Sequence, residues 1–292
     1  MGTEGTMSEQ PSEMNDFSTR QAQDPRSSEA LLVAHRVELE TNAEWDALWI
    51  LRYRGGPQEF EMARELTGSG DSDDRMIGAN LLGQLGVGGA GPMTFPKESV
   101  AILLGLLEDP DTDVIETAIT NLGHRGDARA VSAMIPFAKS DSADIRYAVA
   151  IALVRMHSDE ATATLVAETL TDFTDDDDED TRNWAMFGLG RESEVDSAAI
   201  RAALAAGVKD PNSEIRGEAL VGLARRKDDR TRAALLHEWE HDVVSLLSLE
   251  AAEELADPAL FVRLTELLSV LELDDDQSFK NQLLSAIAAC RS

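Results

Sequence analysis

Apolar residues recur at helical spacing along the chain from Ser28 onward. They form segments of roughly 10–15 residues, separated by turns rich in glycine, aspartate, proline and asparagine. No segment alternates between apolar and polar residues with the period of two that a half-buried strand needs. The pattern therefore predicts an all-α fold. Residues 1–27 are polar and lack the hydrophobic core of a signal peptide, so we expect a disordered leader there.

A repeated unit is visible within the helical segments. Each copy has an acidic turn, then an arginine or its equivalent as an anchor, and a leucine seven residues after the anchor. The copies lie about 30–40 residues apart, the period of stacked helix pairs. We therefore predict an α-solenoid of about seven antiparallel pairs, spanning residues 28–292 as one domain with irregular terminal pairs. The anchor/leucine positions are Arg75/Leu82, Ile115/Leu122, Arg146/Leu153, Arg182/Leu189 and Arg216/Leu223.

The residues of this unit have separate physical roles. Aspartates in the turns accept hydrogen bonds from free amides at the start of the next helix. Small residues six positions after the anchor, such as Gly188 and Gly222, let neighbouring helices approach closely. Each anchor arginine can reach the aspartates of an adjacent turn, so we expect a ladder of ion pairs. Partner helices are predicted at Glu59–Leu66, Glu98–Leu107, Ala128–Ala138, Thr162–Thr171, Ala198–Val208 and Arg232–His241.

The charge balance narrows the classes of partner. The chain has 55 aspartates and glutamates against 26 lysines and arginines, a formal net charge of -29. Such a field repels nucleic acids and anionic membranes and attracts basic proteins. We therefore expect a basic protein partner and no nucleic-acid or membrane partner. Solubility or adaptation to a high-salt habitat explains the acidity equally well, and composition alone does not separate these interpretations.

The expected location rests on two further features. The single cysteine, Cys290, excludes an intrachain disulfide and fits a reducing compartment. No apolar run reaches the roughly 18 residues needed to cross a bilayer. We expect a cytoplasmic protein that is monomeric when free.

The letters HEWEH match the zinc signature H-E-x-x-H, in which two histidines hold a metal and the glutamate activates water. Trp239 lies on the core side of the predicted helix, so His237 and His241 are expected to face solvent. We therefore expect no catalytic residue and no cofactor, and these histidines remain candidates for a surface metal site only. The alternative is a zinc-dependent hydrolase with Glu238 as the base and Glu253 as a third ligand.

The run DFTDDDDEDT, residues 172–181, concentrates carboxylates. Clustered carboxylates suit calcium, but the run lacks the central glycine and terminal glutamate of an EF-hand loop. It leads directly into a repeat helix, so one interpretation is an extended turn that caps this helix. The other is a contact surface for a basic partner.

An aromatic group follows the acidic run. Trp184 is two residues after the anchor Arg182 and flanks the apolar stripe, so packing between repeats accounts for it. Alternatively, Trp184 and Tyr147 of the previous repeat form an aromatic anchor on the inner face, rimmed by acidic turns. The candidate partner-binding residues are Asp175, Asp176, Asp177, Asp178, Glu179, Trp184, Tyr147, Asn183, Glu116 and Glu218.

Three segments resemble bacterial HEAT-repeat proteins, in particular those with phycobilin-lyase-type HEAT-like repeats. The segments are DIRYAVAIALVRM (Asp144–Met156), DEDTRNWAMFGLG (Asp178–Gly190) and EIRGEALVGLARR (Glu214–Arg226). The resemblance extends over about residues 40–260 and implies a helix-pair stack. It implies no single function, because such stacks serve enzymes, scaffolds and inhibitors.

Repeats of this type also occur among immunity proteins that neutralise secreted bacterial toxins. The alkylpurine DNA glycosylases share the architecture, but they need a basic concave face that this acidic chain lacks. The expected function is therefore a non-catalytic, protein-binding scaffold with an acidic surface. We expect either an immunity protein that occludes a basic toxin, such as a nuclease, or a generic adaptor.

Overall fold

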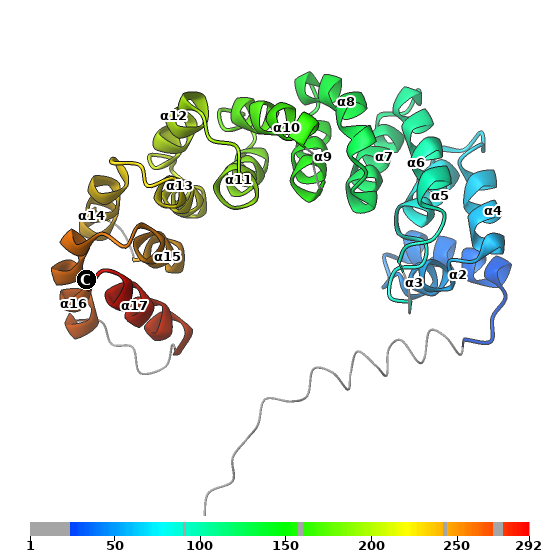
Figure 1. Cartoon of the computed structure of the whole chain (residues 1–292). Helices are drawn as coiled ribbons and strands as arrows, with labels where there is room; N and C mark the ends of the chain where they lie inside the picture. Colours follow the sequence, from blue (N-terminus) through cyan, green and yellow to red (C-terminus); the bar gives the residue numbers. More distant parts are fainter. Residues whose placement is uncertain (1–23, 90–91, 157–159, 242–243, 271–276, 292) are drawn as a thin grey trace, which may run out of the picture. The chain divides into compact units, whose positions relative to one another are not determined.

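The computed structural model describes residues 24–89, 92–156, 160–241, 244–270 and 277–291. Within these ranges every regular element is a helix (Figure 1). The chain divides into two compact units, Met1–Ala133 and Met134–Ser292, called unit 1 and unit 2 below. In the described ranges no helix is both long and apolar enough to cross a membrane. The prediction of an all-α fold is confirmed.

The helices of unit 1 follow one another in short steps. Proline stands at the start of both α4 and α6, where its missing N–H costs nothing. The unit consists of α2 (Ser28–Thr41), α3 (Asp46–Arg54), α4 (Pro57–Leu66), α5 (Ser72–Gln84), α6 (Pro96–Gly105), the 3₁₀ turn η1 (Leu106–Glu108), α7 (Thr112–Arg125) and the 3₁₀ turn η2 (Ala128–Ala130). The short helix α8 (Val131–Met134) spans the boundary between the units.

Unit 2 repeats the same alternation of helix and turn. It begins with the 3₁₀ turn η3 (Ile135–Lys139) and contains one π-helical turn, η4. The other elements are α9 (Ala143–Arg155), α10 (Glu160–Phe173), α11 (Glu179–Phe187), η4 (Gly188–Glu192), α12 (Ala198–Gly207), α13 (Ser213–Arg225), α14 (Thr231–His241), α15 (Leu246–Leu255), η5 (Pro258–Leu260), α16 (Phe261–Val270) and α17 (Gln277–Ala289).

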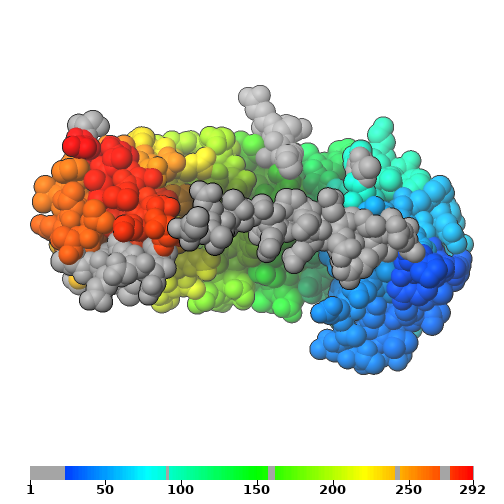
Figure 2. Space-filling model, turned by 90° about the horizontal axis from the view of Figure 1, so that it is seen from below, coloured from blue at the N-terminus to red at the C-terminus, as the bar shows by residue number. Residues whose placement is uncertain are grey.

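Consecutive elements pack as pairs, as the solenoid prediction requires. The pairs are α2–α3, α4–α5, α6–α7, η3–α9, α10–α11, α12–α13, α14–α15 and α16–α17. The described residues thus form eight pairs, one more than the expected number of about seven. Figure 2 shows α2 and α3, in blue, at the end of unit 1, and α16 and α17, in orange and red, at the end of unit 2.

The partner helix predicted over Ala128–Ala138 is present, but it is not α-helical throughout. The structure has three short pieces there, namely η2, α8 and η3. Pro136 stands at the start of η3, because a proline inside a longer helix would remove a hydrogen bond and clash with the preceding turn. The division into two units falls within this stretch of mixed helix type, between Ala133 and Met134.

The predicted ladder of ion pairs is present within each unit. An anchor arginine donates to a carboxylate of the following repeat and also to a backbone carbonyl of its own turn. The nitrogen–oxygen distances are 2.7 Å for Arg75–Asp109 in unit 1 and, in unit 2, 2.7 Å for Arg146–Asp176, 3.0 Å for Arg182–Asp210 and 3.0 Å for Arg216–Glu238.

Two residues of each acidic turn have different roles: one pairs with the preceding anchor arginine and the other caps the following helix. Asp109 receives Arg75, whereas Asp111 caps α7 by accepting a hydrogen bond from a free amide of its first turn. The first of these positions is aspartate only where the preceding anchor is arginine. The anchor Ile115 has no guanidinium, and the next turn carries Ser140 in place of the first aspartate. An aspartate at this turn position therefore marks a repeat that is joined to the preceding one by an ion pair, whereas the Arg216–Glu238 pair takes its carboxylate from α14.

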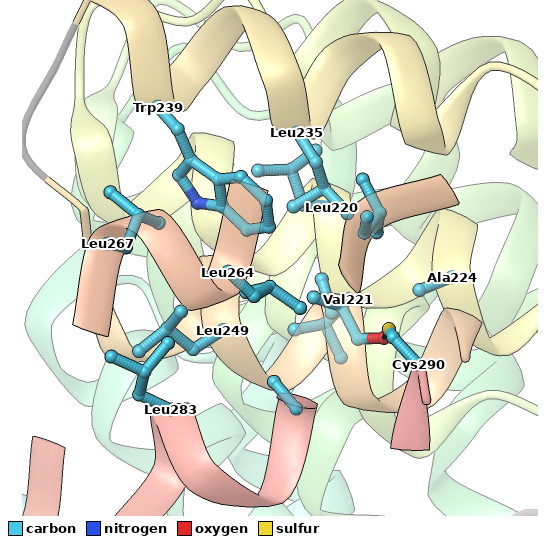
Figure 3. Close-up of a cluster of buried hydrophobic side chains, with 14 residues drawn as sticks. Leu220, Val221, Ala224, Leu235, Trp239, Leu249, Leu264, Leu267, Leu283 and Cys290 are labelled. Carbon is cyan, nitrogen blue, oxygen red and sulfur yellow. Dashed lines mark hydrogen bonds between the residues drawn. The ribbon is translucent and has the colours of Figure 1, made fainter. Parts of the chain in front are cut away.

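The C-terminal half of unit 2 encloses a continuous apolar core (Figure 3). Trp239 is 4% exposed within it, and its indole N–H donates to the Ser248 hydroxyl at 2.9 Å. Cys290 is buried in the same core, with its Sγ 3.5 Å from the carbonyl oxygen of Ala252. Burial raises the pKa of the Cys290 thiol, so the thiol acts as a packed apolar group and not as a nucleophile.

Candidate partner-binding surface

The helices α9, α11, α13 and α15 lie side by side in unit 2 (Figure 1). They contact one another more closely than the first helices of the pairs do. Glycines make this approach feasible: a Cβ added to Gly190 would lie 2.8 Å from the backbone oxygen of Glu218. Because one row of helices is packed more tightly than the other, unit 2 bends toward the tighter row. The outward side chains of this row form what we call the inner side of unit 2.

Trp184 is the aromatic centre of this inner side. It is half-buried on α11, and its ring meets Phe187 edge to face, with centroids 5.7 Å apart. The guanidinium of Arg155 on α9 lies 5.9 Å from the centroid of the Trp184 ring, within the range of a cation–π contact. Trp184 therefore both packs between repeats and binds a cation of its own chain.

A shallow depression of about 270 Å³ opens beside Trp184, lined also by Asn183, Phe187, Glu214 and Glu218. Glu214 is exposed at the start of α13, and its side chain forms no hydrogen bond or ion pair with the described residues. The amide oxygen of Asn183 is buried and has no hydrogen-bond partner among the described residues. An open carboxylate and an unmet acceptor favour a ligand that carries N–H donors and positive charge.

Glu218 has a different role from the one expected. It is 6% exposed and accepts a hydrogen bond from the Nε of Arg191 at 2.7 Å. Arg191 also binds Glu250 of α15 with both terminal nitrogens, at 2.6 and 2.8 Å. Burial raises the pKa of Glu218, although the hydrogen bond from Arg191 lowers it. Glu218 thus forms part of an internal clamp that joins η4, α13 and α15.

Sequence reasoning did not find this clamp. Arg191 lies in the π-helical turn Gly188–Glu192, which adds a residue to the turn and aims the side chain at the next two repeats. The contact partners are 27 and 59 residues away in the chain. The only local signal is the glycine pair around Leu189, which departs from regular helix composition.

The acidic run separates into buried and open carboxylates. Asp176 is bound to Arg146, with 8% of its side chain exposed, and the hydrogen bond from Arg146 lowers its pKa. Asp178 caps α11 through the backbone N–H and the hydroxyl of Thr181. Asp175 and Asp177 are exposed, and their side chains form no hydrogen bond or ion pair with the described residues.

Two further carboxylates of α11 lie at the rim of the run. Glu179 is exposed and accepts a hydrogen bond from the side-chain amide of Asn212 at 2.9 Å. Asp180 is exposed and has no side-chain contact with the described residues. It precedes Trp184 by four residues, so both side chains share one face of the helix. Asp180 was absent from the predicted set.

The other two predicted residues lie elsewhere. Tyr147 is half-buried on α9, the helix next to α11, and does not line the depression at Trp184. Glu116 is half-buried on α7 and belongs to unit 1. The structure therefore gathers Trp184, Asn183 and the acidic run on one unit, but not Glu116.

The HEWEH segment forms the end of α14, and its first glutamate, Glu238, is paired with an arginine. Glu238 is 6% exposed and accepts hydrogen bonds from Arg216 at 3.0 and 3.2 Å. His237 is exposed, as expected, whereas the side chain of His241 lies outside the described residues. Glu253 accepts a hydrogen bond from Gln282 at 2.7 Å. A carboxylate that is almost fully buried and bound to a guanidinium is not placed to activate a metal-bound water, so the hydrolase alternative lacks its central group.

The described side chains also bear on metal binding in general. Among them, no group of three or more histidine, cysteine, aspartate or glutamate residues has an arrangement that could hold a metal ion. This includes the open carboxylates of the acidic run. The calcium interpretation of that run therefore receives no support from its geometry.

The architecture is that of an α-solenoid built from helix pairs. A family model described as HEAT repeats matches residues 99–172 and 167–256. The chain belongs to the HEAT-repeat family. The resemblance seen in the sequence is thereby confirmed at the level of the repeat.

The chain is also similar to individual proteins. It is 29% identical to the protein YibA of Escherichia coli (strain K12) over 238 residues, 78% of this chain and 80% of YibA. The X-ray structure of YibA aligns with a TM-score of 0.72 and 25% identity, covering 99% of each chain. The crystal structure of an engineered protein aligns with a TM-score of 0.56 and 17% identity, covering 96% of this chain and 84% of the other, and shows the fold alone.

Proposed function

We propose that the protein is a non-catalytic scaffold that binds a basic protein through the inner side of unit 2. The contact surface consists of Asp175, Asp177, Asp180, Asn183, Trp184 and Glu214, called the acidic–aromatic surface below. It is smaller than the set expected from the sequence, because Asp176, Asp178 and Glu218 are occupied by contacts within the chain.

One observation carries the proposal. Trp184 lines a depression in which the Glu214 carboxylate forms no ion pair with the described residues, whereas the other lining carboxylate, Glu218, is bound to Arg191. Tryptophan is enriched among residues that dominate binding energy, and open carboxylates around it raise the association rate of a basic partner. The net charge of -29 acts in the same direction over longer distances.

The test is affinity purification with the wild-type protein and two variants, followed by direct binding measurements on the captured protein. Trp184→Ala with Glu214→Lys removes the aromatic anchor and reverses one charge of the surface. We expect the wild type to capture a basic protein and the double variant to bind it at least about 30-fold less tightly. Circular dichroism verifies that the variant keeps the helical content of the wild type.

The matched control is Asp113→Lys. Asp113 is an exposed carboxylate in the first turn of α7, as Glu214 is in the first turn of α13, so both changes disturb the helix dipole alike. The control is expected to bind the partner as the wild type does. Capture of an acidic protein, or equal loss of binding in control and test variants, contradicts the proposal.

The most specific form of the proposal is an immunity protein that occludes a basic toxin such as a nuclease. In that form, one equivalent of the protein abolishes the activity of the captured partner in the cytoplasm. An adaptor binds through the same surface but leaves the activity of its partner intact. An activity assay of the purified partner with increasing amounts of the protein distinguishes the two.

A further inference from the structure

A second groove lies in unit 1, between α2 and the start of α5, outside the acidic–aromatic surface. Its volume is about 710 Å³. Trp45, 42% exposed just before α3, and Leu39, 39% exposed on α2, form its apolar part together with Met76. A large indole left this open to solvent, in a concave site, can receive the flat face or apolar stem of a ligand.

The charges around this groove are unbalanced. It is lined by Glu40, Asp71, Asp73 and Asp74 against a single arginine, Arg36. Arg36 is already bound to Asp74 at 2.5 Å, and Asp71 caps α5 through a backbone N–H. Glu40 and Asp73 are exposed, and their side chains contact none of the described residues. The groove therefore attracts a cation.

A buried histidine lies in the wall of the groove and supports Trp45 from below. His35 lines the groove and is 1% exposed, with its Nδ1 3.0 Å from the Glu38 carboxylate. Glu38 also accepts the N–H of Ala47 at 2.9 Å, so the proton of the imidazole belongs on Nδ1. Burial lowers the pKa of His35, which keeps the ring neutral near pH 7. Its Nε2 then carries a lone pair and has no partner among the described residues.

We propose that this groove binds an arginine side chain of a protein partner. The guanidinium lies over Trp45 and pairs with the open carboxylates of Glu40 and Asp73. A planar cation with several fixed donors matches an indole face and two carboxylates better than a point charge does. A second copy of this chain is disfavoured as the source because each copy carries a net charge of -29.

Arginine side chains already form cation–π contacts with two other tryptophans of this chain. The guanidinium of Arg52 lies 5.3 Å from the centroid of the Trp49 ring, and that of Arg155 lies 5.9 Å from the Trp184 ring. Trp45 differs from these two tryptophans because the chain supplies no such arginine among the described residues. Its ring instead meets the edge of His35, with centroids 5.6 Å apart.

The experiment uses the full chain and a defined probe, the peptide acetyl-Ala-Arg-Leu-Arg-Ala-amide. Nitrogen-15 NMR spectra resolve the indole N–H of each tryptophan, and a Trp45→Phe variant assigns the Trp45 signal. We expect the Trp45 indole signal to shift and saturate as peptide is added. A peptide with citrulline in place of arginine keeps the shape but loses the charge, and is expected to cause no saturable shift.

Charge variants then test the carboxylates. Glu40→Gln with Asp73→Asn is expected to weaken peptide binding at Trp45 about tenfold, the effect of losing two partly exposed ion pairs. The matched control, Glu65→Gln with Asp113→Asn, removes two exposed carboxylates of unit 1 that do not line the groove, from equivalent places in a last and a first helical turn. It is expected to change the affinity less than about twofold.

Three results overturn the proposal: no shift at Trp45, an equal response to the citrulline peptide, or equal weakening in the charge variant and its control. The proposal stands apart from the proposed function, which concerns unit 2. The Trp184 indole reports on that surface in the same spectra. If the Trp184 signal shifts and the Trp45 signal does not, only the proposed arginine site in the groove is contradicted. If the Trp45 signal shifts and the Trp184 signal does not, only the proposed role of Trp184 is contradicted.

Discussion

Arg216 of α13 and Glu238 of α14 form the last rung of the ladder in unit 2, with nitrogen–oxygen distances of 3.0 and 3.2 Å. Both side chains are nearly buried, at 11% and 7% exposure. Glutamate takes the place that aspartate holds in the other rungs, because its longer side chain reaches back from the following helix rather than from the turn. The glutamate of HEWEH is therefore a structural residue of the repeat.

Replacing Glu238 by glutamine is expected to lower the free energy of unfolding by about 2–3 kcal/mol, because it leaves the Arg216 guanidinium partly buried without a counter-charge. Urea unfolding followed by circular dichroism measures the change. Glu61→Gln is the matched control, because Glu61 pairs with Arg64 where both side chains are more than half exposed. Its expected cost is below about 1 kcal/mol. Equal costs for the two variants contradict a structural role for the buried rung.

The pH dependence of stability reports on Asp176. The hydrogen bond from Arg146 lowers the pKa of this carboxyl below its ordinary value of 3.8. Above that ordinary value, the carboxyl is ionised in both the folded and unfolded states, and the ion pair contributes fully. As the pH falls below it, the unfolded chain takes up a proton first, so the contribution shrinks and disappears below the folded pKa.

Asp176→Asn isolates this effect from the other carboxylates. The stability difference between wild type and variant is expected to be largest near pH 7, similar near pH 5, and clearly smaller near pH 3. Urea midpoints at the three pH values measure it. General repulsion among the acidic groups changes alike in both proteins and cancels in the difference. A difference that stays constant down to pH 3 contradicts the lowered pKa.

Much of the fold could be predicted from local sequence signals, whereas the candidate partner-binding surface could be predicted only in part. The spacing of Arg146 and Asp176 identifies the ladder, because each rung repeats the same short pattern. The 3₁₀ segments on either side of α8 could not be predicted, because the apolar periodicity of Ala128–Ala138 does not distinguish a 3₁₀ turn from an α-helical one. The clamp of Arg191, Glu218 and Glu250 could not be predicted, because it depends on a π-helical turn and on helices far apart in sequence.

Close packing at Gly190 gives another prediction. Gly190→Ala is expected to lower the free energy of unfolding by about 2 kcal/mol, because its Cβ would lie 2.8 Å from the backbone oxygen of Glu218. Gly105→Ala provides the contrast, since a Cβ there meets nothing within 4 Å at the end of α6. It is expected to stabilise the protein by about 0.5 kcal/mol. Urea unfolding of both variants gives the comparison, and a neutral Gly190→Ala would contradict close packing at this point.

The ion pair between Glu238 and Arg216 also predicts how removal of zinc affects the stability of the protein. The purified protein is expected to lose any zinc on treatment with a chelator without a change in melting temperature, because no part of the fold depends on that carboxylate binding a metal. Elemental analysis before and after treatment, on wild type and His237→Ala, measures this. Stoichiometric zinc that survives gel filtration in the wild type and disappears in the variant would revive the hydrolase alternative.

Asp175 and Asp177 predict how fast a basic partner binds. Reversing both to lysine is expected to slow association about tenfold at low salt, because their open carboxylates contribute to electrostatic steering, and the difference should fade as salt screens it. Stopped-flow measurements with the captured partner, at several salt concentrations, give the association rates. Glu98→Lys with Asp113→Lys makes the same change in net charge at exposed positions of unit 1. If this control slows binding as much, the net charge of the chain steers the partner, and the acidic run has no local role.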